Sequence, residues 1–110
     1  MGVANMADNM RMRAQLKGEI TEVKVLMTHP METGRRKNDF GEVIPANFIQ
    51  LVSASINGKQ VIEAQWGTGI SKNPYLTFHL RGAKVGDVIK VTWLDNLGKT
   101  GEGEIAVTLA

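Results

Sequence analysis

Two histidines, and the carboxylates that follow one of them, are the first candidates for chemistry in this 110-residue sequence. His29 precedes Glu32 and Asp39 in a polar stretch, and an imidazole with two carboxylates can bind a divalent metal ion. The spacing is not diagnostic of such a site, and a histidine that hydrogen-bonds within its loop is the simpler interpretation. His79 lies on the polar side of an alternating segment, so we expect it to face solvent. A small metal-dependent enzyme is therefore the least favoured of the three functions considered for this sequence.

Other catalytic motifs match in letters but not in context. Gly98-Lys99-Thr100 copies the end of a phosphate-binding loop, but Trp93 occupies the place of that loop's first glycine. Residues 101–106 match the dinucleotide-binding fingerprint, yet no βαβ unit surrounds them. The chain has no cysteine, and no serine stands in a nucleophile elbow. We therefore expect no enzyme activity, no cofactor and no metal, because a small domain without catalytic groups is more often a binding module.

Apolar and polar residues alternate along several short segments, which is the period of a half-buried strand. The clearest alternation covers residues 75–81, 88–95 and 104–109, and two further runs are residues 12–17 and 23–27. About seven such strands in about 100 residues predict an all-β, immunoglobulin-like antiparallel β-sandwich. We expect residues 1–10 to be a flexible tail and residues 11–110 to be the single domain.

The dipeptide Asn57-Gly58 predicts a two-residue hairpin turn between apolar residues 48–56 and 60–66. In the simplest register both faces of this hairpin are apolar, whereas a sheet of a small sandwich buries only one face internally. Either the register differs, or another molecule covers the second face. Our hypothesis is a partner chain on the residues Phe48, Val52, Ala54, Ile56 and Val61.

Charge and composition limit the class of partner. The net charge is +2, and the only run of basic residues is Arg35-Arg36-Lys37. With 5% aromatic residues, the chain lacks the basic stripe and stacking platforms typical of nucleic-acid binding. No apolar run is long enough to span a membrane, and the N-terminus has no secretory signal pattern. We therefore expect neither nucleic acid nor a membrane as partner.

Two loops carry residues that are favoured in protein interfaces. The first is His29-Pro30-Met31-Glu32, where a rigid proline precedes a methionine, a residue favoured on adaptable contact surfaces. The second is Asn73-Pro74-Tyr75, where a tyrosine begins a strand. Ordinary turn chemistry explains both loops equally well.

These loops also carry a resemblance to a known family. The sequence is similar to SoxZ, a subunit of the SoxYZ sulfur-carrier complex of thiosulfate oxidation. The similarity extends over about residues 12–109, with order and spacing kept. Its most specific segments are residues 28–39, 44–45, 57–59, 70–78 and 92–98.

The resemblance implies an immunoglobulin-like, non-catalytic subunit that pairs with SoxY. SoxY carries sulfur on the cysteine of a C-terminal arm, and the cytochrome SoxAX, SoxB and SoxCD-type enzymes act on it transiently. The cycle runs in the periplasm, and SoxZ is exported together with SoxY without a signal peptide of its own.

The resemblance does not say which surface contacts which protein. We assign the apolar hairpin to the contact with SoxY. We assign the docking of the enzymes, or of the SoxY arm, to a second set of residues: His29, Pro30, Met31, Glu32, Asn73, Pro74 and Tyr75. Two alternatives stay open. The chain could be a generic protein-binding or chaperone-like β-sandwich in a sulfur or redox pathway, and the isolated chain could be a homo-oligomer.

Overall fold

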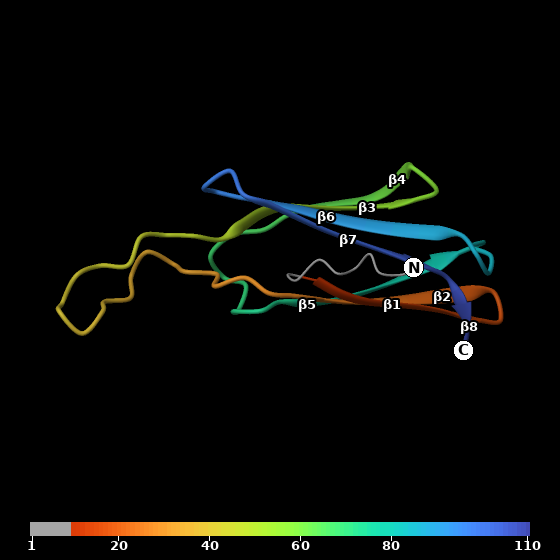
Figure 1. The fold of residues 1–110 in the computed structure, drawn as a ribbon, viewed down its shortest axis with the longest axis horizontal. Coiled ribbons are helices and arrows are strands. Elements are labelled where there is room, and N and C mark those ends of the chain that lie inside the picture. Colours follow the sequence, from red (N-terminus) through yellow and green to blue (C-terminus); the bar gives the residue numbers. More distant parts are fainter. Residues whose placement is uncertain (1–9) are drawn as a thin grey trace.

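The computed structural model describes residues 10–110, and the strands of this range form two stacked sheets (Figure 1). One sheet has the strand order β5-β2-β1-β8 and the other the order β4-β3-β6-β7. All neighbouring strands are antiparallel except β1 and β8, which are parallel. The strands are β1 (Met10–Lys17), β2 (Ile20–Met27), β3 (Ile49–Ile56), β4 (Lys59–Gln65), β5 (Tyr75–Arg81), β6 (Val88–Asp95), β7 (Thr100–Ala106) and β8 (Thr108–Leu109). The predicted immunoglobulin-like sandwich is confirmed.

Alternate residues of the strands point into the space between the sheets and form one apolar core. In β2 the inward residues Val23, Val25 and Met27 are completely buried, and in β6 so are Ile89 and Val91. Each fully buried side chain of this kind stabilises the fold by about 1.5–3 kcal/mol. Nothing among the described residues forms a helix with the length and apolar character that crossing a membrane requires.

The first strand begins two residues before the alternating run at residues 12–17. Met10, assigned to a flexible tail, begins β1 and is only 2% exposed. The rest of the predicted tail, residues 1–9, lies outside the described residues.

The hairpin of β3 and β4 turns where its sequence predicts. Ile56 pairs with Lys59 across the turn Asn57-Gly58, and both turn residues have a positive φ. A bulge after Ala54 then shifts the register by one residue. Since side chains alternate along a strand, a shift of one residue exchanges the two faces of β4 beyond the bulge.

The shifted register gives this hairpin one apolar face instead of two. Val52 pairs with Ala64 and Ala54 pairs with Ile62, so these four residues share the face that lies on the core, whereas Leu51 lies on the opposite face with Gln65. Val61 stays outside and is 39% exposed. The expected second apolar face is therefore wrong, and the difference in register resolves the conflict without a partner chain.

Residues 32–47 project from one end of the sandwich as a long two-stranded arm (yellow in Figure 1). Backbone bridges join Glu32 to Asn47 at its base and Lys37 to Val43 nearer its tip. At the tip, the side chain of Asn38 accepts hydrogen bonds from the backbone N–H groups of Phe40 and Glu42. We refer to residues 32–47 as the arm; the C-terminal segment of SoxY is always called the SoxY arm.

Candidate functional site

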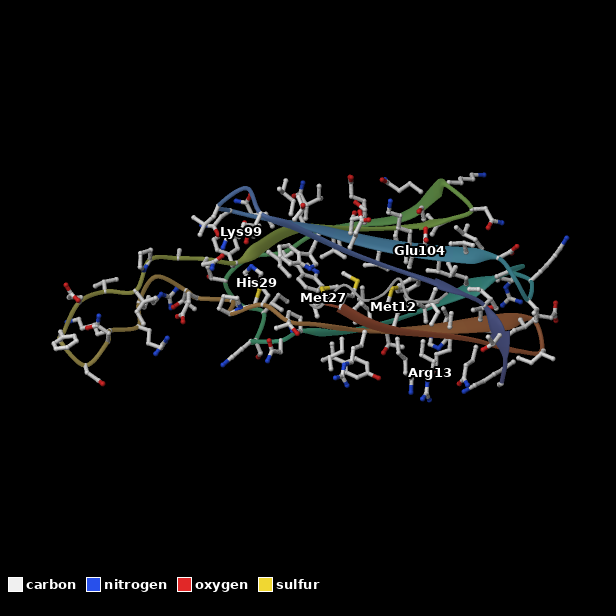
Figure 2. All side chains as sticks on the ribbon, viewed as in Figure 1. Met12, Arg13, Met27, His29, Lys99 and Glu104 are labelled. Carbon is white, nitrogen blue, oxygen red and sulfur yellow. The ribbon has the colours of Figure 1, made fainter. Side chains whose placement is uncertain are left out.

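His29 and Asp95 form a buried hydrogen-bonded pair at the end of the sandwich from which the arm projects. His29 Nε2 lies 3.0 Å from Asp95 Oδ2, and the two residues are 3% and 2% exposed. The backbone N–H of Met31 donates to His29 Nδ1 at 3.0 Å, so the ring proton is on Nε2 and is donated to Asp95. The imidazole also packs edge-on against Trp93, with 5.0 Å between the ring centroids. Figure 2 shows His29 pointing between the sheets.

Asp95 is held as a carboxylate by the turn that follows it. Its Oδ1 accepts the backbone N–H groups of Leu97 and Lys99 at 2.9 and 2.8 Å. Burial acts to raise the pKa of Asp95, but the hydrogen bonds from His29 and the two amides outweigh burial and lower the pKa. Gly98 takes a positive φ in this turn. The pair thus ties the end of β2 to the β6–β7 turn.

The two loops singled out in the sequence lie next to each other. His29 N–H donates to Asn73 Oδ1 and Asn73 N–H donates to the His29 carbonyl oxygen, each at 3.0 Å. Met27 N–H donates to the Pro74 carbonyl oxygen. Both Met31 and Asn73 have a positive φ, at 47° and 52°, which bends each loop back onto the other.

Only some of the predicted docking residues reach the surface. Pro30 and Asn73 are exposed, Glu32 is half-buried, and Tyr75 is 61% exposed. His29, Pro74 and Met31 are buried. The expectation that Met31 offers a flexible contact surface is wrong, because its positive φ turns the side chain inward, where Sδ accepts the N–H of Ile49.

The predicted SoxY-contacting residues are also mainly internal. Val52 and Ala54 are 1% and 2% exposed in the core, and Phe48 and Ile56 pack against it. Only Val61 is exposed. The hairpin face therefore loses the reason for which it was assigned to a partner, namely an apolar surface in excess of the core.

A groove of about 400 Å³ lies beside these loops, at the base of the arm. Its lining residues are Pro30, Met31, Glu32, Thr33, Arg36 and Lys72. Arg36 donates two hydrogen bonds to the Glu32 carboxylate, from Nε at 3.1 Å and from Nη2 at 2.6 Å. This bidentate pair lowers the pKa of Glu32 and raises that of Arg36, and Lys72 adds to the effect on Glu32.

Breaking the Arg36–Glu32 pair should loosen the base of the arm and leave the sandwich intact. The Arg36 side chain is 63% exposed, so Arg36→Gln should hardly change the melting temperature of the chain. Amide hydrogen exchange of residues 32–47 should become about threefold faster or more. Arg35→Gln removes the same charge from the next residue and is the control. Equal exchange rates in the two variants would show that the pair does not restrain the arm.

The proposed metal ligands do not converge. Both ring nitrogens of His29 are occupied by hydrogen bonds, and Glu32 is bound by Arg36. Asp39 lies on the arm and is exposed. Across residues 10–110 no three His, Asp or Glu side chains gather as a metal site would require.

Two features escaped the sequence reasoning. Phe40, near the tip of the arm, is 87% exposed, and its only signal is a lone aromatic residue in a polar stretch. Asp95 ends the alternating segment 88–95, and nothing near it in sequence points to His29, which lies 66 residues away.

Comparison with solved structures supports the fold. The crystal structure of hypothetical protein PH1083 from Pyrococcus horikoshii OT3 has a TM-score of 0.61 and 14% identity, with 96% of this chain and 93% of that chain covered. The CARDB domain of the PF1109 protein from Pyrococcus furiosus, solved with di-metal ions, has a TM-score of 0.39 and 13% identity, with coverages of 94% and 97%. No curated protein matches the sequence. At such identities the first likeness concerns the fold alone.

A family model identifies the chain more specifically. The model described as sulphur oxidation protein SoxZ matches residues 10–106, which is nearly the whole of the described structure. The absence of cysteine agrees with the resemblance noted in the sequence. The chain therefore belongs to the SoxZ family and to the Sox system of sulphur oxidation.

Proposed function

We propose that the chain is the non-catalytic subunit of a SoxYZ carrier complex. The observation that carries the proposal is the SoxZ match over residues 10–106 in a chain without cysteine. Such a chain has no thiol on which to hold sulfur, so the carrier thiol belongs to a partner. In this proposal the partner is SoxY, whose C-terminal cysteine arm carries the intermediates of thiosulfate oxidation.

The buried site supports a structural role and not a catalytic one. His29 and Asp95 are enclosed and use their polar atoms on one another and on backbone amides. A general base needs access to the proton that it removes, and neither group has it. We propose that SoxAX, SoxB and SoxCD-type enzymes act on the SoxY arm while this chain supports the complex. The proposed compartment is the periplasm, reached together with SoxY.

The arm is the part of the chain that best suits contact with SoxY. Phe40 and Val43 are 87% and 55% exposed, and both lie on the part of the arm farthest from its bridged base. Large aromatic side chains commonly anchor protein interfaces by entering a pocket of the partner. The arm thus offers an apolar anchor that the hairpin face does not.

The complex and the contribution of the arm can be tested together. Tagged chain coexpressed with the SoxY of its own genome should be recovered as a stable heteromer in native mass spectrometry. Phe40→Ser should weaken that complex about tenfold or more, because it removes the aromatic anchor. Leu109→Ser removes a side chain that is 70% exposed at the opposite end of the molecule, and it is the control.

The possible outcomes distinguish the proposed function from the proposed contact between the arm and SoxY. Recovery of the chain without SoxY would contradict the proposed function. A complex that tolerates Phe40→Ser as well as Leu109→Ser would keep the function and would remove the arm from the interface.

A further inference from the structure

The outer face of the β5-β2-β1 sheet gathers basic side chains that are scattered in the sequence. Strand alternation places every second residue on this face, and the antiparallel register brings Arg13 opposite Lys24. Figure 2 shows Arg13 pointing away from the other sheet. Among residues 10–110, the charged side chains of this basic face are Arg11, Arg13, Lys17, Lys24, Arg81 and one carboxylate, Glu22.

The single carboxylate is already shared. Glu22 lies 3.3 Å from Lys17, 3.8 Å from Lys24 and 3.6 Å from His79. Within the described part of the chain, Arg11, Arg13 and Arg81 form no ion pair. Three guanidinium groups of this face are therefore available to an external anion.

A hollow of about 360 Å³ lies on the same face, at the end nearer the arm. Arg11, Arg13 and Lys24 line it together with Leu26 and Tyr75. The last two are opposite each other in the register and are 40% and 61% exposed. Cationic groups thus surround a small apolar and aromatic patch.

The other sheet carries no comparable excess of positive charge. It presents Glu63, Glu102 and Glu104 against Lys90 and the turn lysines Lys59 and Lys99, and Lys90 pairs with Glu102 at 3.6 Å. The β5-β2-β1 face is therefore the more positive of the two outer faces. Such an asymmetry orients an approaching charged molecule toward the basic face.

We propose that the basic face binds the acidic surface of a partner protein that presents an apolar side chain among its carboxylates. Guanidinium groups match carboxylates bidentately, and the apolar side chain would enter the hollow beside Leu26 and Tyr75. Nucleic acid fits less well, because Tyr75 is the only aromatic side chain on this face and successive bases need several. The inference goes beyond the proposed function, since it does not depend on SoxY.

The test uses the full chain and a fluorescent copolymer of glutamate and tyrosine as the acidic probe. Binding measured by fluorescence anisotropy should weaken as salt is raised, because exposed charges are screened. The triple variant R11Q/R13Q/K24Q should raise the dissociation constant about tenfold or more. The control K59Q/K90Q/K99Q removes the same charge from the other sheet and its turns, and should change the constant less than about twofold. Thermal melts must show both triple variants folded.

A second variant tests the hollow separately from the charge. Leu26→Ser should abolish the preference for the copolymer over polyglutamate while leaving polyglutamate binding unchanged. Equal losses in the two triple variants would overturn the proposal. So would tighter binding of duplex DNA or phosphatidylserine vesicles, or self-association in sedimentation velocity that R11Q/R13Q/K24Q abolishes. Copurification with SoxY is a separate readout, so failure here is distinguishable from failure of the proposed function.

Discussion

Replacing Gly101 with alanine should destabilise the chain by about 3 kcal/mol, toward the upper end of what overpacking a core costs. A Cβ at this position would overlap the indole ring of Trp93, which is 5% exposed and lies in the neighbouring strand. The ring cannot easily move aside, because its edge contact is His29, and His29 is fixed by Asp95. Urea unfolding followed by tryptophan fluorescence measures the change.

Two other glycines provide graded controls. A Cβ on Gly103 would meet the flexible side chains of Met10 and Met12, with the nearest sulfur at 2.7 Å, so Gly103→Ala should cost about 1 kcal/mol. A Cβ on Gly67 would meet nothing within 4 Å, so Gly67→Ala should change stability by less than about 0.5 kcal/mol. If Gly101→Ala were as mild as Gly67→Ala, the close packing of β7 on Trp93 would be refuted.

The packing role of Gly101 and Gly103 could not be predicted from the sequence. Residues 101–106 match a dinucleotide-binding fingerprint outside its structural context, and alternation places only residues 104–106 of this segment in a strand. In the structure Gly101 and Gly103 are inward residues of β7, together with Ile105, and the two glycines leave room for Trp93 and for the methionines of β1. Alternation predicted one strand over residues 104–109, whereas β7 spans Thr100–Ala106 and β8 (Thr108–Leu109) belongs to the other sheet. The need for small side chains could not be predicted either, because it depends on how closely the two sheets approach at that edge.

The hairpin of β3 and β4 shows a similar limit. Its turn residues, Asn57 and Gly58, are a local signal and were interpreted correctly. The bulge after Ala54 has no comparable signal, because the burial of Ile62 and Ala64 favours it and burial depends on the other sheet. One unpaired residue reversed the assignment of a whole face and with it the predicted partner surface.

The basic face of the β5-β2-β1 sheet could not be predicted from the sequence, for a different reason. The only run of consecutive basic residues in the sequence is Arg35-Arg36-Lys37. The basic face instead combines alternate residues of three strands, for example Arg13 of β1 and Lys24 of β2. Only the register between strands shows that they are neighbours.

The buried His29–Asp95 pair was predicted only in part. A hydrogen-bonding role for His29 was favoured over a metal site, and the structure agrees with that interpretation. Its partner could not be found, because Asp95 belongs to the other sheet. The burial of Met31 depends on a positive φ that a methionine rarely adopts, so no propensity rule would have indicated it.

Replacing Asp95 with asparagine should cost about 2–4 kcal/mol at neutral pH, because it puts a donor group where the carboxylate accepts three N–H groups. The asparagine oxygen can replace Oδ1 and accept the N–H groups of Leu97 and Lys99. Its NH₂ group would then face the Nε2–H of His29. Moving the ring proton to Nδ1 would relieve that conflict only by creating another with the N–H of Met31.

The pH dependence of the same variant follows from the lowered pKa of Asp95. A carboxyl whose pKa is lower in the folded than in the unfolded chain stabilises the fold above its unfolded value, 3.8 for aspartate. That stabilisation is lost as the pH falls through the lower folded value. The difference between wild type and Asp95→Asn should therefore be constant from about pH 7 to about pH 5, and should shrink below about pH 4.

Asp39→Asn is the matched control, since it makes the same change on the exposed arm, and its stability should equal that of the wild type within about 0.5 kcal/mol. His29→Gln is the complementary variant, because glutamine can still donate to Asp95 but loses the edge contact with Trp93. If the charge of Asp95 carries the effect, His29→Gln should be milder than Asp95→Asn, and its deficit should persist at low pH. If the loss of stability in Asp95→Asn does not change with pH, then the packing of the side chain, and not the charge of the carboxylate, holds β2 to the β6–β7 turn.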